Sequence, residues 1–186
     1  MNGNSYVIWE PKDNPSVIWT SMPLLRRVRE LVGVDVYEHF LGTDFTSADL
    51  GFVCLHLQYR LLGEEDHRGK KTYKIEETVP KERAYYSRVI LWVSKDSMLP
   101  MQRDYYDVAG LLWKTETFEE AVIDGVPTPI HIQMQDLHGK SRTDIRVTNV
   151  RYHADVPNAL FDPAELSRAA SSPAWRIAIT QATKGQ

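Results

Sequence analysis

The feature that most constrains this fold is a series of short stretches in which apolar and polar residues alternate. The clearest is FVCLHLQYRLL, residues 52–62, which alternates with a period of two. That period is typical of a β-strand with one drier and one wetter face. The drier face would carry Val53, Leu55, Leu57, Tyr59 and Leu61, and the wetter face would carry Cys54, His56, Gln58 and Arg60.

Further stretches of this kind follow at near-regular spacing. SYVIWE and SVIWT flank PKDNP, whose prolines, Asp and Asn predict a hairpin over residues 5–20. TYKIEETV and TPIHIQMQD alternate in the same way, GEEDHRGKK is expected to be a polar connection, and IDGVP contains an Asp-Gly turn. The pattern predicts about nine or ten strands in one large antiparallel sheet, a mainly β (α+β) fold.

Three segments depart from simple alternation. SRVILWVS, residues 87–94, is apolar almost without a break, so we expect this strand to be covered on both faces. PLLRRVREL, residues 23–31, fits helical spacing but is short enough to be a strand, and both readings stay open. Asp162 before Pro163 predicts an N-cap and the first position of a short helix.

The segment FLGTDFTSADL, residues 40–50, combines aspartates, hydroxyl side chains and two phenylalanines. Thr46 and Asp49 have the spacing of a capping box, which predicts a short capped helix. The alternative is a metal site built from Asp44, Asp49 and His39. That spacing lacks the alternating ligands and terminal Glu of a known calcium loop, so the cap is favoured and no metal is expected.

Composition and charge exclude several functional classes. Hydrophobic residues make up 42% and charged residues 25% of the 186 residues, which is typical of a globular protein. The net charge of -3 argues against a nucleic-acid partner, and no apolar run is long enough to span a membrane. Cys54 is the only cysteine, so an intramolecular disulfide is excluded.

Catalytic and cofactor signatures are absent from the sequence. Neither a nucleophile elbow, a phosphate-binding glycine loop, a dinucleotide-binding glycine motif nor a paired-histidine metal motif occurs. The interpretation is therefore a protein that is not an enzyme and has no cofactor. The one basic concentration, Arg26, Arg27 and Arg29, is read either as charge that protects an edge strand or as a docking patch for a partner or anionic lipid.

Four segments, taken in order, resemble the outer membrane lipoprotein-sorting protein family, whose members are related to the periplasmic lipoprotein carrier LolA. The resemblance covers roughly residues 5–168 and rests on VIWTSMPLLRRVREL, FLGTDFTSADL, WVSKDSMLPMQRDYYDVAGLLWKT and DIRVTNVRYHADVPNALFDPAEL. It implies a strongly curved antiparallel sheet, an unclosed half-barrel, with a few short helices covering its concave side. In this family an apolar cavity between sheet and helices holds acyl chains, and the 40–50 segment would act as a lid.

The resemblance implies non-catalytic binding and transport of lipid or lipoprotein acyl chains in the periplasm. The expected lipid-binding residues are the large apolar ones near the mouth and floor of the cavity, namely Trp19, Leu25, Phe40, Phe45, Leu50, Trp92 and Trp113. Two alternatives stay open: a cell-envelope scaffold without a lipid ligand, docking an envelope protein through the arginine patch, and, ranked lower, a lipid-ester hydrolase. A homodimer through sheet edges is a further expected partnership.

The expected organisation is one lipoprotein-carrier-like domain over residues 1–170 and a C-terminal extension over residues 171–186. Relative to the family, the chain begins partway into the pattern near Tyr6, without the usual signal peptide, N-terminal helix and first strands.

Overall fold

The computed structural model describes residues 5–9, 17–22, 27–31, 36–51, 57–78 and 85–166. The chain divides into two compact units, and each is described by itself. The first comprises Met1–Glu38, Ser47–Cys54 and His153–Gln186, and the second comprises His39–Thr46 and Leu55–Tyr152. The domain boundary expected near residue 170 and the extension over 171–186 lie outside the described residues.

The first unit contains a three-stranded antiparallel sheet of order β1-β2-β3. Its strands are β1 (Ser5–Trp9), β2 (Val17–Met22) and β3 (Arg27–Leu31). Pairing of β1 with β2 confirms the predicted hairpin, although its turn lies outside the described residues. The open choice for residues 23–31 is decided in favour of a strand over its described part, because β3 pairs with β2 from Arg27 to Leu31.

The first unit also contains the predicted C-terminal helical turn. The helices are η4 (Asn158–Phe161), a 3₁₀ turn, and α1 (Pro163–Leu166). The Asp162 carboxylate accepts the Ala164 backbone N–H at 2.9 Å, so the predicted N-cap is confirmed. Leu166 is buried with Val7 and Ile18 among the core residues of the chain.

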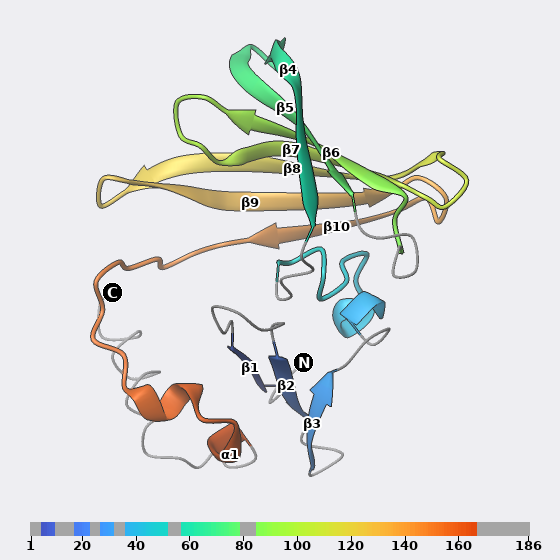
Figure 1. The fold of residues 1–186 in the computed structure, drawn as a ribbon. Helices are drawn as coiled ribbons and strands as arrows, with labels where there is room; N and C mark the ends of the chain where they lie inside the picture. The colour runs from blue at the N-terminus through green and yellow to red at the C-terminus, as the bar shows by residue number, and fades with distance from the viewer. Residues whose placement is uncertain are drawn as a thin grey trace. The chain divides into compact units, whose positions relative to one another are not determined.

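The second unit is built on a seven-stranded sheet of order β10-β9-β8-β7-β6-β5-β4, in which every neighbouring pair is antiparallel. Its strands are β4 (Gln58–His67), β5 (Lys70–Thr78), β6 (Arg88–Ser94), β7 (Pro100–Tyr106), β8 (Leu112–Ile123), β9 (Val126–Asp136) and β10 (Ser141–Arg146). The strand direction turns steadily across the sheet, so that β4 crosses β9 and β10 steeply (Figure 1). The expected fold class is confirmed as mostly antiparallel sheet with few short helices and no closed barrel.

Three local expectations are wrong. The strands belong to two sheets rather than one large sheet. GEEDH is not a loop but the second half of β4, because Asp66 and His67 pair with Lys71 and Lys70 of β5 and only Arg68 and Gly69 form the turn. Residues 47–50 form a turn, not a helix: the Ala48 N–H donates to the Val36 carbonyl, and Gly51 follows with a φ of +72°.

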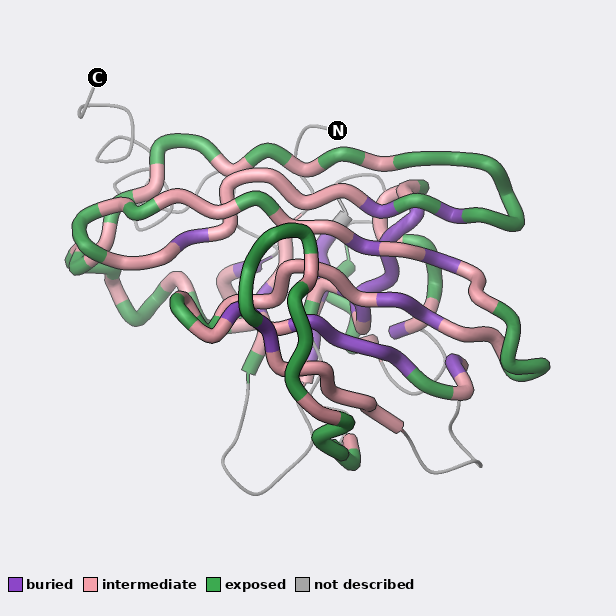
Figure 2. Tube along the Cα trace, turned by 90° about the horizontal axis from the view of Figure 1, so that it is seen from above, coloured by how far each residue is buried: buried purple, intermediate pink, exposed green. Residues whose placement is uncertain are grey.

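The buried strand was predicted correctly. In β6 the four consecutive residues Val89, Ile90, Leu91 and Trp92 are all buried, so both faces of this strand are covered (Figure 2). A single-sided strand would bury only alternate residues. Strand β6 is also the third strand from the β4 edge, well inside the sheet.

Candidate ligand-binding face of the seven-stranded sheet

The strand register aligns two rows of side chains on one face of the seven-stranded sheet, which we call the Arg103 face. Directly paired residues share a face, and residues two apart along a strand share it too. The first row is Leu61, Ile75, Leu91, Arg103, Glu116, Met134 and Thr143. The second row is Tyr59, Glu77, Val89, Tyr105, Lys114, Asp136 and Ser141.

The β4 end of the Arg103 face is apolar and open to solvent. Tyr59 is 65% exposed and Leu61 is 61% exposed. Leu61 pairs with Ile75, which is half-buried, and Ile75 pairs with Leu91, which is buried. The first row thus leads from an exposed leucine at the sheet edge to a buried leucine in its interior.

The centre of the Arg103 face carries charge. The Arg103 guanidinium lies 3.4 Å from Glu116 and 5.4 Å from the centre of the Phe118 ring. The same Glu116 oxygen accepts a 2.7 Å hydrogen bond from the Tyr105 hydroxyl. Burial opposes the charge of Arg103, but the nearby Tyr105 and Glu116 groups outweigh it and raise its pKa, so the guanidinium stays ionised. The Arg103 side chain is 28% exposed, whereas that of Glu116 is only 2% exposed.

A second carboxyl group lies beside this pair. Glu77 follows Ile75 on the same face of β5, and it is half-buried. Burial raises the pKa of Glu77, and attraction to Arg103 offsets part of that rise. Protonation of Glu77 therefore lowers the negative charge around Arg103 at mildly acid pH.

Toward β10, the Arg103 face contains a fully buried lysine. Lys114 Nζ donates to the Asp44 carbonyl at 2.8 Å and to the Tyr86 hydroxyl at 3.3 Å. It also lies 5.1 Å from the centre of the Trp113 ring. The pairing of β7 with β8 skips Trp113 at a β-bulge, which allows the indole and the Lys114 side chain to meet.

The segment His39–Thr46 is fixed to the β10 end of this face through Asp44. Its two carboxylate oxygens accept hydrogen bonds from the Ser141 and Thr143 hydroxyls, one residue from each row. Burial disfavours the charged form, but these hydrogen bonds and the charge of Lys114 together lower the pKa of Asp44. This carboxylate therefore fastens the segment while the β4 end stays exposed.

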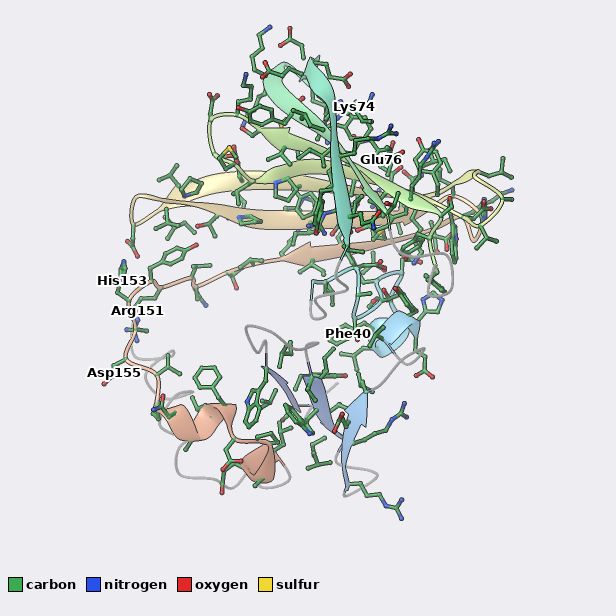
Figure 3. All side chains as sticks on the ribbon, in the orientation of Figure 1. Phe40, Lys74, Glu76, Arg151, His153 and Asp155 are labelled. Carbon is green, nitrogen blue, oxygen red and sulfur yellow. The ribbon has the colours of Figure 1, made fainter. Side chains whose placement is uncertain are left out.

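The opposite face of the sheet is polar. One row on it consists of Arg60, Glu76, Ile90, Asp104, Thr115, Gln135 and Arg142. Trp92 lies on this polar face, stacked on His67 at 4.6 Å, with its indole N–H donated to Glu65 and Lys74 5.0 Å above its ring. Lys74 and Glu76 are labelled on β5 in Figure 3.

The residues expected to bind lipid are spread over both units. In the second unit, Trp113 lies on the Arg103 face near Lys114, Phe45 follows Asp44 and is fully buried, and Phe40 is half-buried in η2 (Phe40–Gly42; Figure 3). In the first unit, Trp19 packs edge-on against Trp9 at 4.8 Å, and Leu50 lies in a turn. Leu25 lies outside the described residues.

Of the basic patch, Arg27 and Arg29 are exposed on β3, an edge strand of its sheet, while Arg26 lies outside the described residues. Among the residues that the structure describes, no cluster of three or more His, Cys, Asp or Glu side chains could hold a metal ion. No helix in the described ranges is long and apolar enough to cross a bilayer.

Sequence reasoning missed the charged centre of the Arg103 face. Arg103, Glu116 and Lys114 lie in MQRDYYDV and LLWKTETFEEAV, two stretches whose polar residues were read only as strand alternation. Their signal is the register: polar residues at positions directly opposite Leu91 and Met134 must share the face of those buried apolar side chains. Sequence alternation alone does not supply that pairing.

Comparison with known proteins identifies the relatives of this chain. A family model described as an uncharacterized protein matches residues 1–168. The crystal structure of a DUF1329 family protein from Desulfovibrio piger is 30% identical, with a TM-score of 0.79 over 89% of this chain and 71% of that chain. No curated protein matches the chain.

Two further crystal structures share the fold. An outer membrane lipoprotein-sorting protein domain from Vibrio parahaemolyticus is 20% identical, with a TM-score of 0.79 over 89% of this chain and 72% of that chain. A LolA superfamily protein from Nitrosomonas europaea is 23% identical, with a TM-score of 0.55 over 87% of this chain and 77% of that chain. The expected LolA-like fold is thereby confirmed.

Proposed function

The chain belongs to the DUF1329 family and to the family of uncharacterized proteins whose model it matches, and from this premise we propose that it binds and carries acyl chains of lipids or lipoproteins. The binding is non-catalytic and takes place in the periplasm of the cell envelope. The ligand lies against the Arg103 face of the seven-stranded sheet.

The observation that carries this proposal is the exposed apolar end of the Arg103 face on a LolA-like fold. Leu61, Ile75 and Leu91 form a continuous apolar row that begins at the solvent-exposed sheet edge. Burial of acyl methylenes against such a row contributes about 0.8 kcal/mol per CH₂ before ordering costs. A long acyl chain can therefore be held with few polar contacts.

The polar groups of the face support binding rather than turnover. Glu116 accepts from Tyr105, Lys114 donates to Asp44 and Tyr86, and Asp44 accepts from two hydroxyls. Groups committed to one another in this way position the surface. A hydrolase would need a nucleophile with a hydrogen-bonded base, and this chemistry ranks lower.

The test is to purify the protein, extract bound lipid and examine the intact protein by native mass spectrometry. We expect co-purified acyl lipid, and uptake of a fluorescent fatty acid that unlabelled lipid displaces. Absence of both bound lipid and probe uptake would count against the carrier. A screen with lipid esters completes the experiment, and turnover would support the hydrolase instead.

A scaffold function in the cell envelope is the second candidate. Arg27 and Arg29 are exposed two residues apart on the edge strand β3, so they project from the same side of that strand. A protein partner or an anionic surface could bind this pair through charge. Serine at Arg26, Arg27 and Arg29 should abolish binding to such a partner, and unchanged binding would remove the patch from consideration.

A further inference from the structure

The first row of the Arg103 face is a continuous path from solvent to a cation. It runs Leu61, Ile75, Leu91 and then Arg103, one residue from each of four neighbouring strands. Three strand spacings separate its ends, on the order of 14 Å. An extended hydrocarbon chain laid along this row would reach the guanidinium with one end and solvent with the other.

An apolar ligand alone would be a poor match for this row. The Arg103 side chain is 28% exposed, and its pKa is raised, so it presents a permanent charge at the inner end. Covering a charge with hydrocarbon costs free energy unless an opposite charge accompanies it. A ligand that covers the row therefore binds best if it brings an anion to Arg103.

The partner of Arg103 within the protein leaves room for that anion. Glu116 lies 3.4 Å from the guanidinium, beyond the 2.7–2.9 Å that is usual for charged hydrogen bonds. The same oxygen is already held by Tyr105 at 2.7 Å. Glu116 thus keeps a hydrogen bond of its own when Arg103 turns its planar fork toward a carboxylate or phosphate, the geometry that suits both anions.

We propose that Arg103 is the anchor for the anionic head group of an amphiphile whose acyl chain lies along Leu91, Ile75 and Leu61. This inference rests on the proposed function and adds the ligand class, an acyl chain ending in a carboxylate or a phosphate ester. The head group lies at the inner end of the row and the tail points to the exposed β4 edge.

The test compares ligands that differ only in the head group. Hexadecanoic acid, hexadecyl phosphate and hexadecan-1-ol are each used to displace an uncharged fluorescent alkyl probe from the intact protein above neutral pH. The two anions should bind about ten- to a hundredfold tighter than the alcohol. Inorganic phosphate alone should not displace the probe, and displacement by phosphate at comparable concentration would assign the site to a free anion and overturn the amphiphile.

Variants identify the residue. Arg103→Gln should remove the preference for the anions while leaving the alcohol affinity unchanged, and Arg103→Lys should restore part of that preference. Arg60→Gln is the matched control, since Arg60 lies on the polar face of the same sheet, where it pairs with Glu76. Arg103→Gln combined with Glu116→Gln removes both charges, so it serves if the single variant fails to fold.

The outcomes separate the two proposals. A protein that takes up the alcohol and the acid equally, or an Arg103→Gln variant that loses both to the same extent, overturns the anchor but leaves the carrier intact. A protein that takes up no amphiphile overturns the carrier and the anchor with it.

Discussion

Asp44 and Thr143, ninety-nine residues apart in the chain, are joined by two hydrogen bonds. The Asp44 backbone N–H donates to the Thr143 hydroxyl oxygen at 3.0 Å, and that hydroxyl donates to the Asp44 carboxylate at 2.6 Å. The first bond fixes the backbone of the 39–46 segment, and the second fixes its only buried carboxylate. Together they attach the segment to β10 in a defined position.

The first prediction is that Asp44→Asn destabilises the protein. The variant removes the charge that the Ser141 and Thr143 hydroxyls solvate, and such hydrogen bonds contribute about 1.5–3 kcal/mol each. Urea unfolding measures the change. Asp66→Asn is the control, because its ion pair with Lys71 is largely exposed and should cost no more than about 1 kcal/mol. Equal losses in the two variants would contradict the role of Asp44.

The second prediction concerns acid. The pKa of Asp44 is lowered from 3.8 in the folded protein, so the unfolded chain binds more protons in the range just below that value. Its stabilisation is therefore complete above the unfolded pKa and is lost as the pH falls through the folded pKa. The difference in unfolding free energy between wild type and Asp44→Asn should be constant near neutral pH and shrink in acid. A constant difference throughout would contradict it.

Glu77 should show the opposite dependence. Its pKa is raised from 4.5, so the folded protein binds more protons above that value, and the stability associated with Glu77 falls as the pH rises through the folded pKa. Glu77→Gln should gain stability relative to wild type between acid and neutral pH, measured as a difference in urea midpoint. Glu119→Gln, on an exposed residue of β8, serves as the control and should show no such trend.

The hydrogen bond between Tyr105 and Glu116 gives a fourth prediction. Both side chains are buried, so Tyr105→Phe leaves the Glu116 oxygen short of a donor and should cost about 1–3 kcal/mol. Tyr106→Phe changes the same group on the next, half-buried residue, whose ring lies under Arg88. It should cost less. Thermal unfolding of the two variants measures the difference, and a smaller loss in Tyr105→Phe would contradict the prediction.

Local sequence patterns were sufficient for much of the strand content. Alternation correctly placed Tyr59 with Leu61, and Ile132 with Met134, on shared faces, and the Asp162-Pro163 cap was found from two residues. The polar GEEDH stretch was misread as a loop because composition favours solvent. Its pairing with the lysines of β5, which lets the strand continue, is not visible in local composition.

The charged centre of the face could not be predicted for a related reason. Arg103 and Glu116 are thirteen residues apart and meet only because β7 and β8 pair in one register, with a bulge that skips Trp113. A slip of one residue would move either side chain to the other face. Trp92 illustrates the same limit: its apolar character suggested the cavity, whereas the register places it on the polar face with Gln102.

The last prediction tests where an acyl chain enters. Leu61 is 61% exposed at the β4 edge of the first row, so Leu61→Ser removes apolar area from the ligand path while changing little of the buried core. We expect weaker binding of a fluorescent fatty acid with nearly unchanged thermal stability, since exposed substitutions usually alter stability by about 0.5 kcal/mol or less. Val122→Ser is the matched control, because Val122 is 71% exposed near the end of β8 and pairs with Pro127, outside both rows. Equal binding by the two variants would show that the chain does not pass over Leu61.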